Sequence, residues 1–230
     1  MSILINASDK VQFHNPASLS FNGSTEYIDC TTVAEEVSIA RGTVSAWVKL
    51  DSTSINGVIF KASVDANNNV TMNYNNSSQK IQMQYKAGGT AKVADASFAF
   101  EGNDTWYHLC MTWDTGADEL KGYIDGTQID STLSSLGTWS GTIDTVMSAK
   151  NSLANNSYWS GHITHLAVFD GVVSPTLLYN GGTPGNLNGL SGLKMWFTMR
   201  EQSGTSVADY SGTGNTGTLY NTPTWTTDTP

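Results

Sequence analysis

Hydrophobic and polar residues alternate along several short runs of the sequence. Apolar residues take every second position from Val44 to Leu50, and again from Tyr107 to Trp113. Successive side chains of a β-strand point to opposite faces of a sheet, so each run predicts a strand with one apolar, buried face. The alternating pattern therefore predicts a β protein.

Gly, Asn and Ser separate these runs at short intervals. The dipeptide Asp125-Gly126 supplies the positive φ of a two-residue turn and predicts a hairpin that continues to residue 131. One short helix is expected near residues 175–180, because Pro175 suits a first helical position and Ser174 can cap it. Further strands are predicted at 18–21, 26–30, 58–63, 70–74, 81–85, 120–124, 143–149, 162–169, 193–198 and 217–219. This spacing predicts an all-β fold, a two-sheet antiparallel β-sandwich with one short helix.

The length of 230 residues suits one large core, since all-β sandwiches of about 200–250 residues fold as single domains. The strands at 193–198 and 217–219 are too short to bury a core of their own. We therefore expect a single domain over 1–230, with the C-terminal block 193–225 returning to the same sandwich.

Acidic residues outnumber basic ones by 20 to 11, which gives a net charge of −9. This charge repels nucleic-acid phosphates and anionic membranes, so neither is expected as a partner. No run approaches the roughly 20 apolar residues of a membrane span. The first ten residues lack a basic start, a long apolar run and a cleavage site, so no signal peptide is expected.

The two cysteines, Cys30 and Cys110, could form one disulfide bond, but two cysteines do not make a disulfide framework. Cys110 lies in the middle of a predicted core strand. A free cysteine behaves there as a small hydrophobic residue, so we favour two reduced, buried thiols.

Five segments together resemble one known family. They are LSFNGSTEYI at 19–28, GTVSAWVKL at 42–50, TWYHLCMTWD at 105–114, LKGYIDGTQI at 120–129 and SGHITHLAVFDGVVSP at 160–175. In this order and spacing they resemble the laminin-G-like, concanavalin-A-like jelly-roll domains, which implies a jelly roll over nearly the whole chain. The block at 193–225 resembles one that often precedes the LSFNG segment in cellular members. Its late position is similar to the order in virion proteins of tailed phages, especially marine ones.

Members of this family often bind calcium through acidic residues, which the resemblance places at Asn22 and near Thr164. Neither residue is acidic here. An amide and a hydroxyl are weaker partners than carboxylates for a cation that takes about 6–8 oxygen ligands. No cofactor is therefore expected, with calcium as the open alternative.

No catalytic constellation stands out. Glycoside hydrolysis needs two carboxylates about 5–9.5 Å apart, whereas Glu35-Glu36 and Asp118-Glu119 are adjacent in probable loops. The Gly-rich segment 212–217 matches a dinucleotide motif but lacks the strand before it and the helix after it. We expect a protein that is not an enzyme.

The histidines do not form an obvious metal pair. His162 and His165 are three residues apart, which places them on opposite faces of a regular strand. His108 lies on the reverse side of a core strand, where a buried or half-buried imidazole is the common explanation.

The candidate ligand-binding residues are the rings Trp139, Tyr158 and Trp159, with Asn151, Asn155 and Asn156 as hydrogen-bonding neighbours. They lie in Gly-, Ser- and Asn-rich surroundings, where an exposed ring can stack on a sugar or anchor a protein interface. The alternative is that the rings close the ends of the sandwich.

These observations favour a non-enzymatic, surface-exposed structural or binding module. The hypothesis is a virion decoration, fibre or adhesion protein, at the virion surface or outside the cell. It would form a homo-oligomer and contact other virion subunits, host glycans or both. The alternative is a secreted carbohydrate-binding lectin or a glycan-active hydrolase on the same fold.

Overall fold

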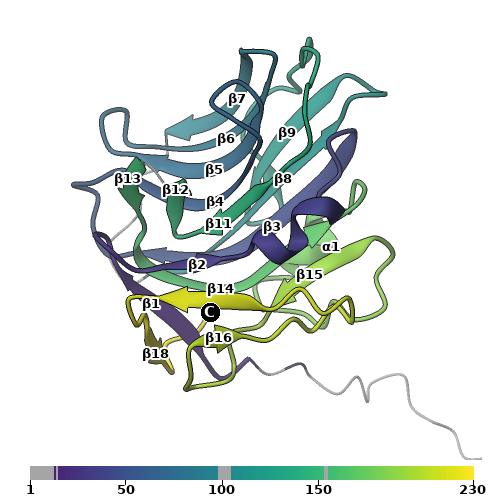
Figure 1. Cartoon of the computed structure of the whole chain (residues 1–230). Coiled ribbons are helices and arrows are strands. Elements are labelled where there is room, and N and C mark those ends of the chain that lie inside the picture. The colour runs from purple at the N-terminus through teal and green to yellow at the C-terminus, as the bar shows by residue number, and fades with distance from the viewer. Residues whose placement is uncertain (1–12, 14, 98–104, 153–154) are drawn as a thin grey trace, which may run out of the picture.

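The computed structural model describes residue 13 and residues 15–97, 105–152 and 155–230. Within this part of the chain, two antiparallel sheets pack into a sandwich (Figure 1). The two-sheet antiparallel architecture predicted from the alternating pattern is confirmed.

The first sheet, called sheet A, contains the strands with the longest apolar runs. Its hydrogen-bonded order is β10-β9-β8-β3-β14-β1-β18, and β15 also pairs with β14. In chain order the strands are β1 (Ser18–Asn22), β3 (Arg41–Leu50), β8 (Tyr107–Asp114), β9 (Glu119–Ile124), β10 (Thr127–Gln128), β14 (Ser160–Phe169), β15 (Leu193–Phe197) and β18 (Thr224–Thr226).

The second sheet, called sheet B, has the order β16-β17-β2-β11-β4-β5-β6-β7. Its strands are β2 (Tyr27–Asp29), β4 (Gly57–Ser63), β5 (Asn69–Asn75), β6 (Lys80–Ala87), β7 (Thr90–Ser97), β11 (Thr145–Ser148), β16 (Ser206–Val207) and β17 (Gly217–Tyr220). Residues far apart in sequence thus meet in one layer.

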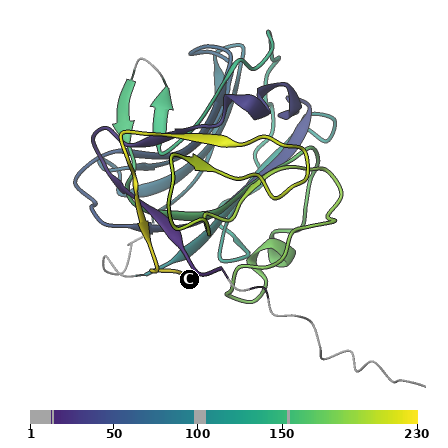
Figure 2. The ribbon, with the colours of Figure 1, turned by 60° about the horizontal axis from the view of Figure 1, so that its bottom comes forward.

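Three small elements complete the described structure. The strands β12 (Lys150–Ser152) and β13 (Asn155–Tyr158) form a separate hairpin, and η1 (Thr31–Glu36) is a 3-10 helix. The predicted short helix is α1 (Pro175–Tyr179), which ends where Asn180 adopts a left-handed conformation. Figure 2 shows the β12–β13 hairpin and α1 at opposite sides of the molecule.

The main core lies between the two sheets and takes the apolar stripes predicted from the sequence. In β3 the residues Val44, Ala46 and Val48 are fully buried there. Trp113 of β8 also fits this core because Gly42 faces its indole. A Cβ at Gly42 would lie 2.3 Å from the Trp113 ring, so the close approach requires glycine.

A second apolar cluster covers the outer face of sheet A. It joins β-strand residues such as Phe169 and Trp196 to Leu178 of α1 and Leu187 of the following loop. All are buried. The central strands of sheet A are therefore buried on both faces.

A bulge in β14 changes which residues share a face. His165 has a φ of 54°, and the register with β3 shifts there. Ile163 and Leu166 both join the main core although they are three positions apart. His162 and His165 consequently both lie on the outer face of sheet A. The prediction of opposite faces is wrong, because a bulge adds one residue to the alternation.

The strands of the C-terminal block pair with both sheets. β15 pairs with β14 and β18 with β1 in sheet A, whereas β17 pairs with β2 in sheet B. The cysteines Cys30 and Cys110 are both free and fully buried, as favoured from the sequence. Burial raises the pKa of both thiols, so they are unreactive at neutral pH.

Candidate functional site

The outer face of sheet B carries a regular row of polar side chains. In β5 and β6, buried apolar residues alternate with half-buried or buried polar ones. Val70, Met72 and Tyr74 point into the core, as do Ile81, Met83 and Tyr85. The outward positions are Asn69, Thr71, Asn73 and Asn75 in β5 and Lys80, Gln82, Gln84 and Lys86 in β6.

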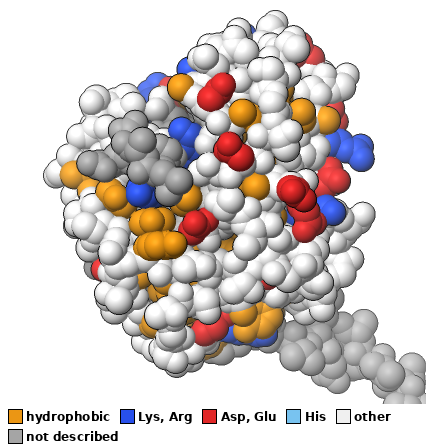
Figure 3. Space-filling model, in the orientation of Figure 1, with side chains coloured by type: hydrophobic (Ala, Val, Ile, Leu, Met, Phe, Trp, Pro, Cys, Tyr) orange, Lys and Arg blue, Asp and Glu red, His pale blue; other side chains and the backbone are white. Residues whose placement is uncertain are grey.

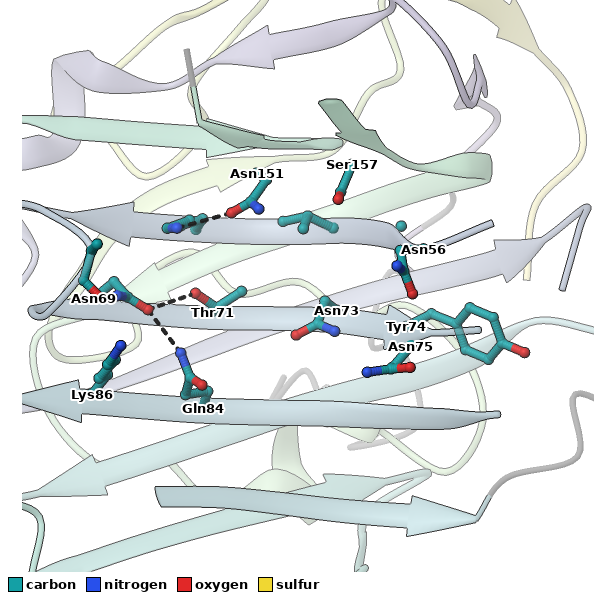
Figure 4. A pocket seen from close by; sticks show the side chains of 14 residues that line it. Asn56, Asn69, Thr71, Asn73, Tyr74, Asn75, Gln84, Lys86, Asn151 and Ser157 are labelled. Carbon is teal, nitrogen blue, oxygen red and sulfur yellow. Dashed lines mark hydrogen bonds between the residues drawn. The ribbon is translucent and has the colours of Figure 1, made fainter. Parts of the chain in front are cut away.

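All of these side chains except Lys80 and Gln82 line a groove of about 330 Å³. β4, β5 and β6 supply the floor, and the β12–β13 hairpin overhangs one side with Asn151 and Ser157 (Figure 4). Asn56 closes one end, and Lys86 lies at the other (Figure 4). The site is thus a concave surface on a rigid sheet, a common setting for a ligand.

A network of hydrogen bonds fixes the side chains at the lysine end of the floor. The Asn69 Oδ1 atom accepts bonds from Thr71 Oγ1 at 3.1 Å and from Gln84 Nε2 at 2.9 Å. Asn69 and Thr71 are 3% and 7% exposed, so their positions are well constrained. A polar surface fixed in this way needs little rearrangement on binding.

A second network orients the amides at the other end. Asn73 and Asn75 each donate a hydrogen bond from Nδ2 to the Gln82 Oε1 atom, at 3.4 and 3.2 Å. Asn75 Oδ1 also accepts from the backbone N–H groups of Ser77 and Ser78. The hydrogen-bonding pattern at this end is therefore set before any ligand arrives.

Two lysines contribute positive charge to the groove. Lys61 Nζ donates a hydrogen bond to Asn151 Oδ1 at 2.9 Å, which ties β4 to the hairpin. Burial, together with the nearby charge of Lys86, lowers the pKa of Lys61. The described residues that line the groove include no Asp and no Glu. The lining thus lacks the carboxylate pair that glycoside hydrolysis requires.

A hydrogen-bonded Ser–His pair in sheet A is inaccessible. Ser45 Oγ and His108 Nε2 are hydrogen-bonded at 2.8 Å, but the two residues are only 2% and 1% exposed. Burial lowers the pKa of His108 to about 3. This pair lies beneath the segments that cover the outer face of sheet A, namely α1 and the loop that follows it, and cannot reach a substrate.

The sequence-predicted residues do not form one site. Asn151 lines the groove. Asn155 and Asn156 lie in β13, but their side chains fall outside the described part of the structure.

Tyr158 belongs to an aromatic cluster rather than to the groove lining. Its ring centroid lies 6.5 Å from that of Tyr27, which stacks on Tyr220 at 4.7 Å with parallel planes. The ammonium of Lys150 lies 4.3 Å from the centre of the Tyr27 ring. Tyr158 is thus engaged within the fold and leaves only part of its ring to solvent.

The two tryptophans close the sandwich rather than face a ligand together. Trp159 is fully buried, so its expected role as an exposed stacking ring is corrected. Its indole packs beside Gly57, where a Cβ would lie 2.9 Å away. Trp139 is half-buried, and its ring centroid lies 5.5 Å from that of Tyr85. Both placements follow the alternative interpretation that the rings cap the core.

The two positions considered for calcium are occupied with other bonds. Asn22 Oδ1 accepts hydrogen bonds from the N–H groups of Ser24 and Thr25, so it is directed toward donors. Thr164 is fully buried and donates to Thr198 O at 2.9 Å. Asn22 pairs with Ser160, about 13 Å along β14 from Thr164 at 3.3 Å per residue. The described residues contain no cluster of three or more metal-ligating side chains.

Apart from Asn151, the groove residues were missed although their signal is present in the sequence. Every second residue from Asn69 to Asn75 is Asn or Thr, and Lys80 to Lys86 alternates Lys and Gln with apolar residues. Amides are depleted in strands, so two neighbouring strands with polar residues at every outward position indicate a polar, exposed face.

Residues 22–177 match the family described as the Concanavalin A-like lectin/glucanases superfamily. Among curated proteins, none matches the sequence. The described residues contain no helix with the length and apolar character of a membrane span.

Several solved structures share the fold. A putative carbohydrate binding protein from Bacteroides ovatus superposes with a TM-score of 0.66 and 14% identity, over 92% of this chain and 59% of that one. This chain thus spans about three fifths of that protein. The Ruminococcus gnavus IT-sialidase CBM40, bound to α2,3-sialyllactose, superposes with a TM-score of 0.58 and 14% identity, over 71% of this chain and 95% of that one. Domain 4 of the arabinanase AbnA from Geobacillus stearothermophilus, in complex with arabinotriose, has a TM-score of 0.58 and 17% identity, over 71% of this chain and 75% of that one. At these identities the likeness shows the fold alone.

Proposed function

The chain belongs to the concanavalin A-like lectin/glucanase superfamily, and from this we propose that it is a carbohydrate-binding module without catalytic activity. The binding site is the groove on the outer face of sheet B. Its ligand is an oligosaccharide that lies along β5 and β6.

The observation that carries this proposal is the chemistry of the groove lining. Amides and hydroxyls predominate, and the described lining has no carboxylate. Each amide offers donors and acceptors together, which matches the hydroxyl groups of a sugar. Because Asn69 and Gln82 hold their neighbours in place, the hydrogen-bonding pattern is preorganised.

The solved neighbours and the surface chemistry support this assignment. Two of these neighbours are complexes with oligosaccharides, and another is described as a putative carbohydrate binding protein. Figure 3 shows neutral side chains and backbone predominating on the side of the molecule seen in Figure 1. A neutral polar surface favours a hydroxyl-rich ligand.

The direct test is a glycan microarray, followed by calorimetric titration of the oligosaccharides that bind. Asn73→Ala removes an amide from the groove and is expected to weaken binding by about five- to tenfold, the value of one hydrogen bond. Gln128→Ala removes an exposed amide from the edge of sheet A and is the matched control. Binding that is absent, or unaffected by Asn73→Ala, would contradict the proposal.

A reducing-sugar assay on the same oligosaccharides separates a binding module from a hydrolase. We expect no turnover, because the described groove lining lacks a carboxylate pair. Turnover by the purified protein would reverse the assignment.

The virion role and the homo-oligomer remain predictions from the sequence. The virion role rests on the late position of the 193–225 block. Size-exclusion chromatography with mass measurement and cosedimentation with purified phage particles test both. A monomer that never associates with particles would contradict them and leave carbohydrate binding in place.

A further inference from the structure

The two ends of the groove differ in charge. Lys61 of β4 pairs with Thr71 of β5, and Lys86 of β6 pairs with Asn69. The two lysines therefore flank the same short stretch of β5 from both sides. At the far end stand neutral amides, including Asn56 and Asn75 (Figure 4).

Within the described part of the chain, neither of these two lysines forms an ion pair with a carboxylate, whereas four other lysines do. Lys80 and Lys194 form ion pairs with Asp95 and Glu36 at 2.9 and 3.3 Å. Among the described residues, no Asp or Glu oxygen lies within 4 Å of the Lys61 or Lys86 ammonium.

The acidic group that Lys86 influences is already engaged. Lys86 contributes to the lowered pKa of Asp65, which lies in the β4–β5 turn. The Asp65 Oδ1 atom accepts hydrogen bonds from the N–H groups of Asn67 and Asn68, both at 2.8 Å. Asp65 therefore stabilises the β4–β5 turn and does not form an ion pair with either groove lysine.

Like charges placed close together raise the free energy of the unliganded protein. Lys86 lowers the pKa of Lys61 in addition to the effect of burial, so the repulsion is felt in the folded state. An anion bound between the two ammonium groups would relieve it. Thr71 and Gln84 lie between the lysines and would contribute neutral hydrogen bonds.

We propose that the lysine end of the groove binds the acidic group of a glycan, a carboxylate or a sulfate ester, while neutral sugar units extend toward Asn56 and Asn73. This inference rests on the proposed carbohydrate-binding function and adds the class of ligand and its direction in the groove. A lysine ammonium binds either oxyanion through charge-assisted hydrogen bonds.

Matched oligosaccharides provide the test. One pair is a uronate-containing oligosaccharide and its carboxyl-reduced form, and the other is a sulfated oligosaccharide and its desulfated form. Calorimetric titration of the wild-type protein at low and high salt gives the affinities. We expect the acidic member of at least one pair to bind about tenfold more tightly, with a difference that shrinks as salt rises. The pair that shows the difference identifies the acidic group.

Variants then assign the effect to the lysines. Lys61→Gln and Lys86→Gln should each weaken binding of the acidic member by about tenfold and leave the neutral member within about twofold. Lys61→Arg keeps the charge and should retain most of the preference. Lys92→Gln is the matched control, because Lys92 pairs with Tyr85 and so points to the other face of sheet B. Thermal melting of each variant checks that it folds.

The outcomes separate this inference from the proposed function. If both members of each pair bind equally, and neither lysine variant changes this, the acidic preference is wrong and carbohydrate binding stands. If poly-L-glutamate binds as tightly as the acidic oligosaccharides, the lysines attract anions without glycan selectivity, and the inference is overturned. If no oligosaccharide binds the wild-type protein, the proposed function fails together with it.

Discussion

The outer faces of the two sheets have opposite character, although their inner faces share one core. In β8 of sheet A, every residue from Tyr107 to Trp113 is buried. In β6 of sheet B, buried and half-buried residues alternate strictly from Lys80 to Ala87. The first strand is covered on both sides, and the second is open on one.

The cover of sheet A explains the difference. α1 and the loop that follows it place Leu178 and Leu187 against Phe169 and Trp196. No helix lies over β5 and β6 in the described structure, and the β12–β13 hairpin lies against the neighbouring β4. The polar groups of sheet B therefore remain available to a ligand, whereas histidines and hydroxyls of sheet A are sealed inside. Among the described residues, the open row of polar side chains therefore lies on the outer face of sheet B.

The largest expected effect is on stability, beneath the cover of sheet A. Phe169→Ala removes a ring that is 1% exposed and should lower the free energy of unfolding by about 3–5 kcal/mol. Gln82→Ala, on the open face of sheet B, should cost about 1 kcal/mol or less. Urea denaturation measures both. Equal losses would show that the two outer faces are equally important for stability.

Acid should destabilise the protein through the buried histidines of sheet A. Burial lowers the pKa of His108 to about 3 and that of His165 to about 4, whereas an unfolded histidine titrates near 6.5. Between these values the unfolded chain binds more protons than the folded one. Stability should therefore fall as the pH drops from about 6.5 to about 4, by up to about 1.4 kcal/mol per pH unit for each histidine.

Denaturation curves at several pH values measure this slope, and His108→Gln should make it shallower. The described groove lining contains no histidine. Binding of a neutral oligosaccharide should consequently stay constant between pH 5 and 7 while the protein remains folded. A pH-independent stability would contradict the buried, neutral histidines.

A negative charge at the lysine end of the groove should weaken binding of an acidic ligand. Asn69→Asp keeps an oxygen that can accept from Thr71 and Gln84 but adds a negative charge between the two lysines. We expect about tenfold weaker binding of an acidic oligosaccharide. Because the Asn69 Nδ2 hydrogen bonds to Asp65 O and Ala66 O are lost at a buried position, the free energy of unfolding should also fall by about 1–3 kcal/mol.

Asn75→Asp is the matched control, because its Oδ1 position accepts backbone N–H groups and can keep them as a carboxylate. It lies at the neutral end of the groove and should change the same affinity by about twofold. Calorimetric titration compares the two variants. Equal effects would contradict the inferred direction of the ligand.

The smallest expected effect is that of calcium. Asn22 Oδ1 faces backbone donors and Thr164 is buried, so millimolar calcium or EDTA should leave the melting temperature unchanged. Differential scanning fluorimetry provides the measurement. A clear rise in melting temperature with calcium would show that a metal site exists after all.

Strand positions were predicted well where apolar residues alternate or run together. The stripes in β3 and β8, the Asp125-Gly126 turn and the helix at Pro175 all appear in the structure. β7 was missed because most residues of its sequence, TAKVADAS, are small or charged. The hairpin that overhangs the groove was missed because its Asn- and Ser-rich strands resemble a loop.

The binding residues were harder to predict than the strands. Trp159 was chosen because its neighbours are polar, yet its ring turns inward beside Gly57. Asn69 and Gln84 were passed over because each alone resembles an ordinary surface amide. Their role follows from register, which brings residues 15 positions apart into one hydrogen bond.

The sequence by itself determined the sandwich, since alternating apolar residues must bury one face of each strand, and it determined the family through its ordered segments. It also excluded an obvious carboxylate pair. Only the tertiary structure decided which outer face stays open, because that depends on where α1 and its loop pack. It also decided that Lys61 and Lys86 share one end of a groove, because pairing across three strands, and not sequence distance, sets which charges lie close together.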